Sequence, residues 1–221
     1  MPDDRRLAFK ILTWIYYAKC RLGFNQLREA LSVEDGDASL PTDLISREDI
    51  IECCQGLVVE AEVRREYHEP TELIFAHGTV KEFLQDRHID NLQPHYSITK
   101  VCLTYLGFSV FNDPCENMTS LRLRNQKYRF TSYAARYWAE HARDEIESVD
   151  ELRSAILRTF ESVGKRESIE QFTRAPRFTR LASPTGKTLL HFLVETRLIS
   201  VYISQLTSEL TVNSENQFNN K

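Results

Sequence analysis

Two short segments rich in β-branched and aromatic residues interrupt a chain that otherwise carries helical patterns, and this limits the possible folds most. Residues 57–63 (LVVEAEV) and 71–76 (TELIFA) are typical of strands, and the charged residues 64–70 between them predict a turn. Thr79 then begins an amphipathic helix. The apolar side of this helix carries Val80, Phe83 and Leu84. The sequence therefore predicts a mainly α-helical protein with one β-hairpin.

Three helices are predicted before the hairpin. Apolar residues recur every three or four positions at 3–18, and a shorter pattern of the same kind covers 24–31. Ser46 is a typical N-cap for the third helix, which we expect to end at Gly56 in a left-handed conformation. Three helices followed by a two-stranded wing are the elements of a winged helix, so we expect residues 1–90 to form a winged-helix domain.

Only helices are expected after the hairpin. The predicted helices cover residues 94–107, about 130–141, 148–160 and 165–174. Pro94 suits a first helical position, where its missing N–H group costs nothing. Residues 111–127 are less regular, and no helix bounds are predicted there. Residues 91–183 are thus expected to form an α-helical linker domain.

The composition argues against several classes of protein. The net charge of −4 gives no general attraction to nucleic acid or to an anionic membrane. No apolar run approaches the roughly 20 residues of a membrane span, and the N-terminal sequence is not a signal peptide. The five cysteines are irregularly spaced, unlike the paired ligands of zinc sites. We expect a cytoplasmic protein with reduced cysteines, no bound metal and no cofactor.

Three motifs resemble one family. The run HGTVKEFL at 77–84 is similar to H-x-T-V-K-E-[YF]-L, and RLGFNQLREAL at 21–31 is similar to P-L-T-L-E-E-L-R-E-A-L. The run FTSYAARYW at 130–138 is similar to F-L-R-Y-A-A-R-H-W. These patterns belong to the winged helix and helical region that follow the NACHT nucleotide-binding module in fungal STAND proteins, which are NLR-like signalling ATPases. The resemblance implies the downstream part of such a protein, with a NACHT module as partner in cis or in trans.

His77 is the candidate site residue that this resemblance implies. In related STAND proteins the histidine at this point faces the bound nucleotide, so His77 is expected to sense nucleotide when a NACHT module is present. It follows a strand and precedes a helix, whose N-terminus favours phosphate. Plant and animal relatives carry Met-His-Asp here, and only the histidine matches in this chain, between Ala76 and Gly78. The alternative is a histidine that caps its own helix.

A second resemblance lies near the C-terminus. Residues 186–194 (GKTLLHFLV) are similar to the ankyrin pattern G-x-T-P-L-H-x-A-A, and the second ankyrin helix is expected at 199–206. The chain departs from the pattern at Arg197, where glycine is usual. We expect one ankyrin-like helix pair at 184–210, either a first or a capping repeat, and a flexible tail at 211–221.

The sequence favours a non-catalytic role. Gly186-Lys187-Thr188 is not a Walker A motif, because Leu181 stands where a glycine is required and no clear strand precedes it. No nucleophile–base pair is visible, so no catalytic residue is assigned. The resemblance implies a non-catalytic regulatory fragment of a STAND protein. In such a protein the winged helix holds the nucleotide switch closed, and the ankyrin-like region serves protein recognition.

Two other functions remain open from the sequence. The first is a stand-alone helical scaffold for protein interactions. The second is a winged-helix protein that binds nucleic acid. The candidate recognition helix at 46–54 argues against the second, because it sets Arg47 against three carboxylates and phosphates would repel it. These carboxylates are Glu48, Asp49 and Glu52.

Overall fold

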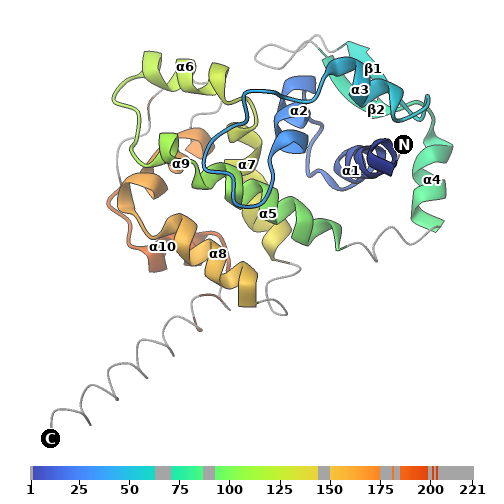
Figure 1. Ribbon diagram of the computed structural model, residues 1–221. Coiled ribbons are helices and arrows are strands. Elements are labelled where there is room, and N and C mark those ends of the chain that lie inside the picture. Colours follow the sequence, from blue (N-terminus) through green and yellow to red (C-terminus); the bar gives the residue numbers. More distant parts are fainter. Residues whose placement is uncertain are drawn as a thin grey trace, which may run out of the picture.

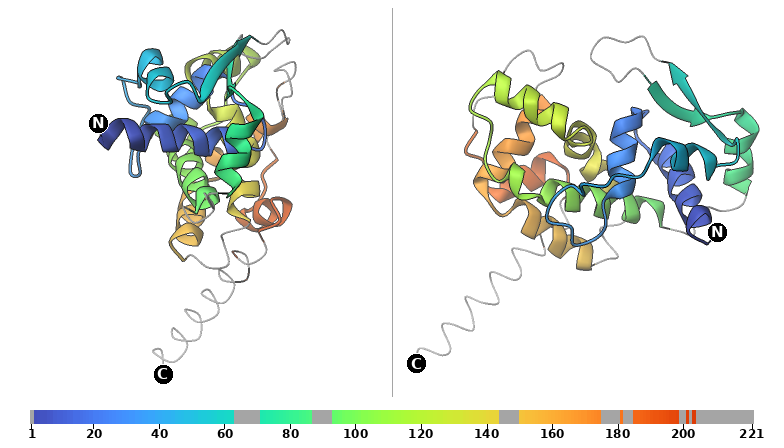
Figure 2. Two further views of the ribbon diagram at one scale, coloured as in Figure 1. Left: turned by 90° about the vertical axis from the view of Figure 1, so that its right-hand side faces the viewer. Right: turned by 45° about the horizontal axis from the view of Figure 1, so that its top comes forward.

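The computed structural model describes residues 2–62, 71–86, 93–143, 150–174, 181, 185–198, 201 and 203. In these residues the protein is mainly helical, with ten α-helices and one two-stranded antiparallel sheet (Figures 1 and 2). None of these helices is long and apolar enough to cross a bilayer.

The three helices predicted before the hairpin are confirmed as α1 (Pro2–Tyr17), α2 (Phe24–Ser32) and α3 (Arg47–Glu52). Ser46 is the N-cap of α3, and its Oγ accepts a hydrogen bond of 3.0 Å from the Asp49 N–H group. The helix ends four residues before Gly56, because the chain turns through Cys53 and Cys54. Gly56 has the expected left-handed conformation, with φ of 80°.

The two predicted strands are confirmed as β1 (Val58–Glu62) and β2 (Thr71–Phe75). They pair antiparallel, with Val58 opposite Phe75 and Glu62 opposite Thr71. The connecting turn at 63–70 lies outside the described residues. Helix α4 (Gly78–Asp86) follows β2 directly.

After α4 the described residues contain helices and no strand. The helices are α5 (Pro94–Gly107), the 3₁₀ turn η2 (Ser109–Phe111), α6 (Met118–Lys127), α7 (Thr131–Ala142), α8 (Asp150–Phe160), α9 (Val163–Arg174) and α10 (Leu189–Glu195). The segment 111–127, for which no helix bounds were predicted, contains α6 in its second half. This helix is polar and buries Leu121 alone, so it shows no apolar stripe. The sequence signal for the start of α6 is the capping box between Asn117 and Ser120.

Helix α5 crosses the middle of the molecule beside α7, with the sheet and α1 to α4 on one side (Figure 1). The buried side chains form one hydrophobic cluster from α1 to Val201. Trp14 of α1, for example, meets the ring of Phe130 edge-on at 5.5 Å, just before α7. The core thus runs across residue 90, where the expected winged-helix domain ends. The proposed domain division stays a prediction.

Two expected segments lie largely or wholly outside the described residues. Of the second ankyrin helix at 199–206, Val201 and Ile203 are described, and both are helical. The expected tail at 211–221 lies wholly outside.

Candidate functional site

His77 lies at the junction between β2 and α4, and its side chain is exposed. The Thr79 N–H group donates to His77 Nδ1 at 3.2 Å, and Thr79 Oγ1 lies 3.0 Å from the same nitrogen. The histidine therefore caps α4, which is the alternative that the sequence left open. Capping of α4 and recognition of a nucleotide are compatible roles for His77, because the cap uses only one ring nitrogen.

The cap determines which nitrogen of His77 carries the proton. Since Nδ1 accepts from a backbone N–H group, the neutral ring must hold its hydrogen on Nε2. That nitrogen is then a hydrogen-bond donor at the N-terminus of a helix, where the helix dipole also favours an anion. An oxyanion such as a phosphate oxygen is the natural acceptor for this group.

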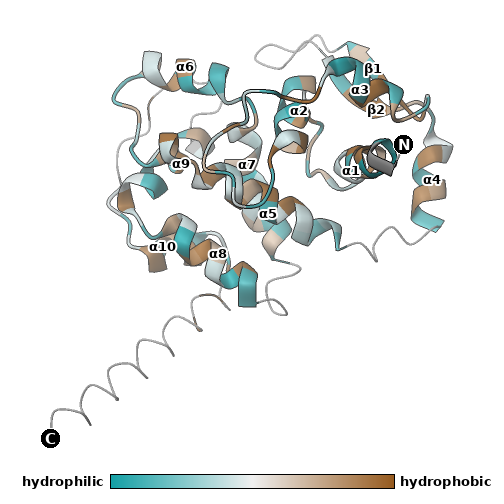
Figure 3. Cartoon of the chain, viewed as in Figure 1, coloured by the Kyte–Doolittle hydropathy of each residue, from teal (hydrophilic) through white to brown (hydrophobic). Residues whose placement is uncertain are grey.

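A broad groove lies between α1, α3 and α4, with a volume of about 1310 Å³. Its apolar lining includes Leu7, Ala8, Phe9, Leu12, Ile45, Leu57, Val80, Phe83 and Leu84. Phe83 was expected on the same apolar side of α4 as Leu84, but it is 55% exposed while Leu84 is buried. Phe9 on α1 is 40% exposed. The middle of α4 is correspondingly hydrophobic (Figure 3). Part of this apolar surface thus belongs to α4, the helix that His77 caps.

Two adjacent thiols also line the groove. The Sγ atoms of Cys53 and Cys54 lie 4.0 Å apart. Burial raises the pKa of both thiols, that of Cys54 to about 12. The thiols are therefore protonated at neutral pH, which makes them poor nucleophiles. Nowhere in the described part of the chain do three or more His, Cys, Asp or Glu side chains gather as a metal site would need.

In the ankyrin-like segment, Thr188 and His191 are in contact at the start of α10 (Leu189–Glu195). Thr188 is the N-cap of α10, and its Oγ1 lies 2.8 Å from His191 Nδ1 and accepts from the His191 N–H group at 3.3 Å. Lys187 forms ion pairs with Glu170, at 3.0 Å, and with Glu195. This lysine is thus engaged by carboxylates and is not placed in a phosphate-binding loop.

We predict that the isolated chain does not bind ATP. The chain lacks the glycine of a Walker A motif, and the Lys187 ammonium is already paired with two carboxylates. Isothermal calorimetry with Mg-ATP should detect no heat of binding. Micromolar affinity that is lost in Lys187→Ala would contradict the prediction.

Sequence reasoning missed a buried carboxylate that joins two of the motifs. Glu29 of α2 accepts hydrogen bonds from Tyr105 Oη at 2.5 Å and from the N–H groups of Arg129 and Phe130, each at 3.0 Å. These two N–H groups lie just before α7, so Glu29 caps that helix from a distance. A glutamate in a helix pattern resembles a surface residue, and nothing local in the sequence indicates its remote partners.

Comparison of the chain with protein-family models, with curated proteins and with solved structures found no match. The resemblance to STAND proteins therefore stays a prediction that rests on the three motifs. The chain itself presents an exposed histidine cap beside an open apolar groove.

Proposed function

We propose that this chain is a non-catalytic regulatory module of a STAND-type signalling NTPase. In this proposal α1 to α4 and the hairpin act as a winged helix that docks on a nucleotide-binding module through the groove. The ankyrin-like segment from residue 186 onward contributes to protein recognition. The order of helices and strands in residues 2–86 supports the winged-helix assignment.

The observation that carries the proposal is the position of His77. Its Nε2–H donor lies at the N-terminus of α4, the same helix that presents Val80 and Phe83 to the groove. A protein module seated in the groove would cover Phe9 and Phe83, which together form an exposed apolar patch. A phosphate bound to that module could then accept the histidine hydrogen bond.

Binding of nucleic acid is supported less well. Arg47, the basic residue of α3, forms an ion pair with Glu60 on β1, and its guanidinium lies 4.8 Å from the centre of the Phe24 ring. A guanidinium held by these contacts is not free to neutralise a phosphate. The groove rim also carries Asp4, Asp49 and Glu52, which would repel a nucleic-acid backbone.

The proposal predicts a loss of nucleotide retention when His77 is removed. The protein for this test is the chain fused behind the NACHT module of a STAND protein, loaded with labelled ADP. A hydrogen bond to a charged phosphate contributes about 1.5–3 kcal/mol, so His77→Ala should speed ADP release by about tenfold or more. Phe83→Glu should have a similar effect, because it places a charge in the groove.

His191→Ala is the matched control, because His191 forms the same kind of contact with Thr188 at the start of α10. It should leave ADP release unchanged. Circular dichroism of each variant should show the helical content of the parent. Unchanged ADP release in both His77→Ala and Phe83→Glu would contradict the proposal and favour the stand-alone scaffold.

A further inference from the structure

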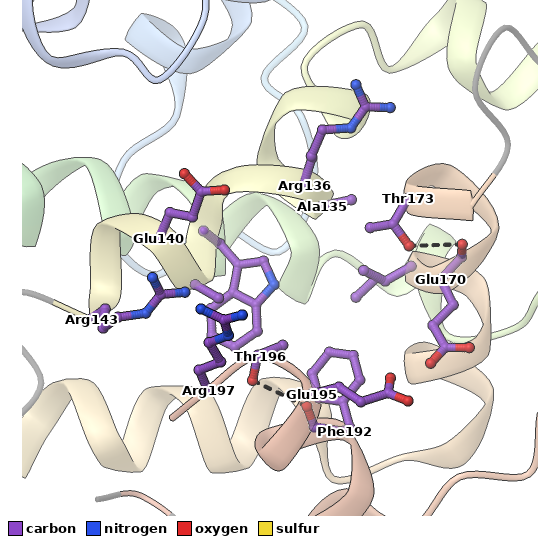
Figure 4. A pocket seen from close by; sticks show the side chains of 13 residues that line it. Ala135, Arg136, Glu140, Arg143, Glu170, Thr173, Phe192, Glu195, Thr196 and Arg197 are labelled. Atoms are coloured by element: carbon purple, nitrogen blue, oxygen red, sulfur yellow. Dashed lines mark hydrogen bonds between the residues drawn. The ribbon is translucent and has the colours of Figure 1, made fainter. Parts of the chain in front are cut away.

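Two hollows in the described part of the chain differ in what they expose. The smaller, of about 430 Å³, lies between α7, α9 and α10 (Figure 4). Its aromatic residues Trp138 and Phe192 are buried and stack on each other, while exposed charged residues such as Arg197 form its rim. The groove between α1, α3 and α4 instead has exposed apolar walls and contains the thiols of Cys53 and Cys54. Reactive side chains and open apolar surface thus occur together in the groove.

Cys53 and Cys54 lie where α3 ends, and this position brings their thiols together. Adjacent residues inside a helix do not face each other. Cys53, however, is the C-cap of α3, and Cys54 lies in the turn that follows, so their Sγ atoms are 4.0 Å apart. Cys53 is half-buried and Cys54 is buried. A reagent that enters the groove therefore meets Cys53 first.

The distance between the two sulfurs suits a bridging atom better than a disulfide. A disulfide needs sulfurs about 2.05 Å apart and usually joins Cα atoms about 4.4–6.8 Å apart, whereas the Cα atoms of adjacent residues are about 3.8 Å apart. Two sulfurs bound to one atom by bonds of about 2.3 Å, the length of a zinc–thiolate bond, lie about 3.3–3.8 Å apart when the angle at that atom is between about 90° and 109°. The observed separation of 4.0 Å is close to this range.

The surroundings of the thiols favour a bridge that carries no charge. Burial raises the pKa of both thiols, and the carboxylates of Asp4 and Asp49 raise the pKa of Cys53 further. A metal cation such as zinc would need two thiolates and further ligands. In the described part of the chain no third His, Cys, Asp or Glu joins this pair in a metal-binding arrangement. Trivalent arsenic, by contrast, converts two neutral thiols into a neutral product.

We infer that Cys53 and Cys54 form a binding site for a trivalent organoarsenical, held in the groove by one As–S bond to each sulfur. An arsine oxide, R–As=O, and two S–H groups give R–As(SR′)₂ and one molecule of water, because both thiol protons pass to the oxygen. Arsenic stays trivalent, so no oxidant is needed. Once Cys53 has reacted, Cys54 is adjacent to it and the second bond closes within the molecule.

The organic group of the ligand has a place in the same groove. Leu7, Leu12 and Leu57 are among its apolar lining residues, and its volume of about 1310 Å³ exceeds what a single aromatic ring requires. The inference does not depend on the proposed function, because it needs no nucleotide-binding module and does not use His77.

The experiment adds phenylarsine oxide to the whole reduced chain and follows the intact mass under non-denaturing conditions. The chain should gain one phenylarsine oxide less one water and should keep this adduct in an excess of 2-mercaptoethanol. A monothiol competes well with one As–S bond but poorly with two linked ones, and 2,3-dimercaptopropanol should remove the adduct. Cys53→Ser and Cys54→Ser should each bind the reagent about a hundredfold more weakly or worse, because the second bond no longer forms.

Cys20→Ser is the matched control, because Cys20 is an exposed cysteine that does not line the groove. It should retain the parent affinity. Circular dichroism of each variant should show the helical content of the parent, and Cys53→Ser changes a half-buried side chain outside the tightly packed core. Loss of the parent adduct in 2-mercaptoethanol, or parental affinity in Cys53→Ser, would overturn the inference. Zn²⁺ that the parent retains through gel filtration and Cys53→Ser does not would also overturn it, and would assign the pair to a metal cation.

Discussion

Replacing Glu29 with leucine should destabilise the protein by about 3 kcal/mol or more, because three donors, two of them buried, lose their acceptor at once. The side chain of Glu29 is 4% exposed, and Tyr105, which donates to it, is completely buried. Burial raises the pKa of Glu29, while its hydrogen bonds oppose this shift. Each donor that remains unsatisfied in the folded state costs about 1–3 kcal/mol.

Thermal or urea unfolding monitored by circular dichroism measures this effect. For a chain of this length, 3 kcal/mol corresponds to a decrease in Tm of roughly 6–12 °C. Tyr105→Phe removes one of the three donors and should cost about 1 kcal/mol. Glu34→Leu changes an exposed glutamate just after α2 and is the matched control, which should change stability by less than about 0.5 kcal/mol. A loss below about 1 kcal/mol in Glu29→Leu would show that the network does not hold the helices together.

The Glu29 network also shows where the sequence ceases to predict the fold. Local patterns placed the helices and strands well, because caps such as Ser46 and the proline at Pro94 act within a few residues. The bounds of helix α6 could not be predicted, because a polar helix has no apolar period to detect. The contact between Glu29 and Phe130 spans about a hundred residues, and no local pattern encodes it.

The features of the candidate sites also differ in whether they depend on neighbouring residues or on the packing of the whole chain. The position of His77 at a strand–helix junction, and its capping alternative, could be predicted because both depend on neighbouring residues. The groove could not, since the spacing of Phe83 resembles that of a core residue and only the packing of α4 leaves it exposed. The sequence showed that Arg197 replaces a glycine. Its left-handed conformation at the rim of a cavity emerged only from the structure.

Glu29 connects two of the motifs on which the family resemblance depends. It is the glutamate of LREAL, and Phe130 begins the FTSYAARYW run. Under the proposed function, a displacement of the winged helix by the nucleotide-binding module would act directly on the N-terminus of α7.

A chain of hydrogen bonds joins the end of α1 to α5 and α7. The Lys19 N–H group donates to Tyr133 Oη at 3.1 Å, so the tyrosine O–H group can donate to His141 Nε2 at 2.8 Å. His141 Nδ1 must then carry the ring hydrogen, which it donates to His95 Nδ1 at 2.9 Å. Every polar atom of the buried His141 ring is used by its neutral form.

Acid should therefore destabilise the protein through His141. Burial, together with the repulsion that a protonated His95 would exert, lowers the pKa of His141 from 6.5 to about 3. The unfolded chain binds a proton on this residue below pH 6.5 while the folded chain does not, so stability falls as pH decreases through this window. The expected slope is about 1.4 kcal/mol per pH unit, or about 2 kcal/mol between pH 7 and pH 5.

Urea unfolding at pH 7, 6 and 5 tests this expectation above the range in which most carboxylates titrate. His141→Gln keeps a polar side chain but has no proton to gain, so its stability should depend on pH by about 2 kcal/mol less than that of the parent over this range. His191→Gln removes an exposed histidine and should keep the parental slope. A parent whose stability is flat from pH 7 to pH 5, or a His141→Gln variant with the parental slope, would show that the buried ring takes up its proton without loss of the fold.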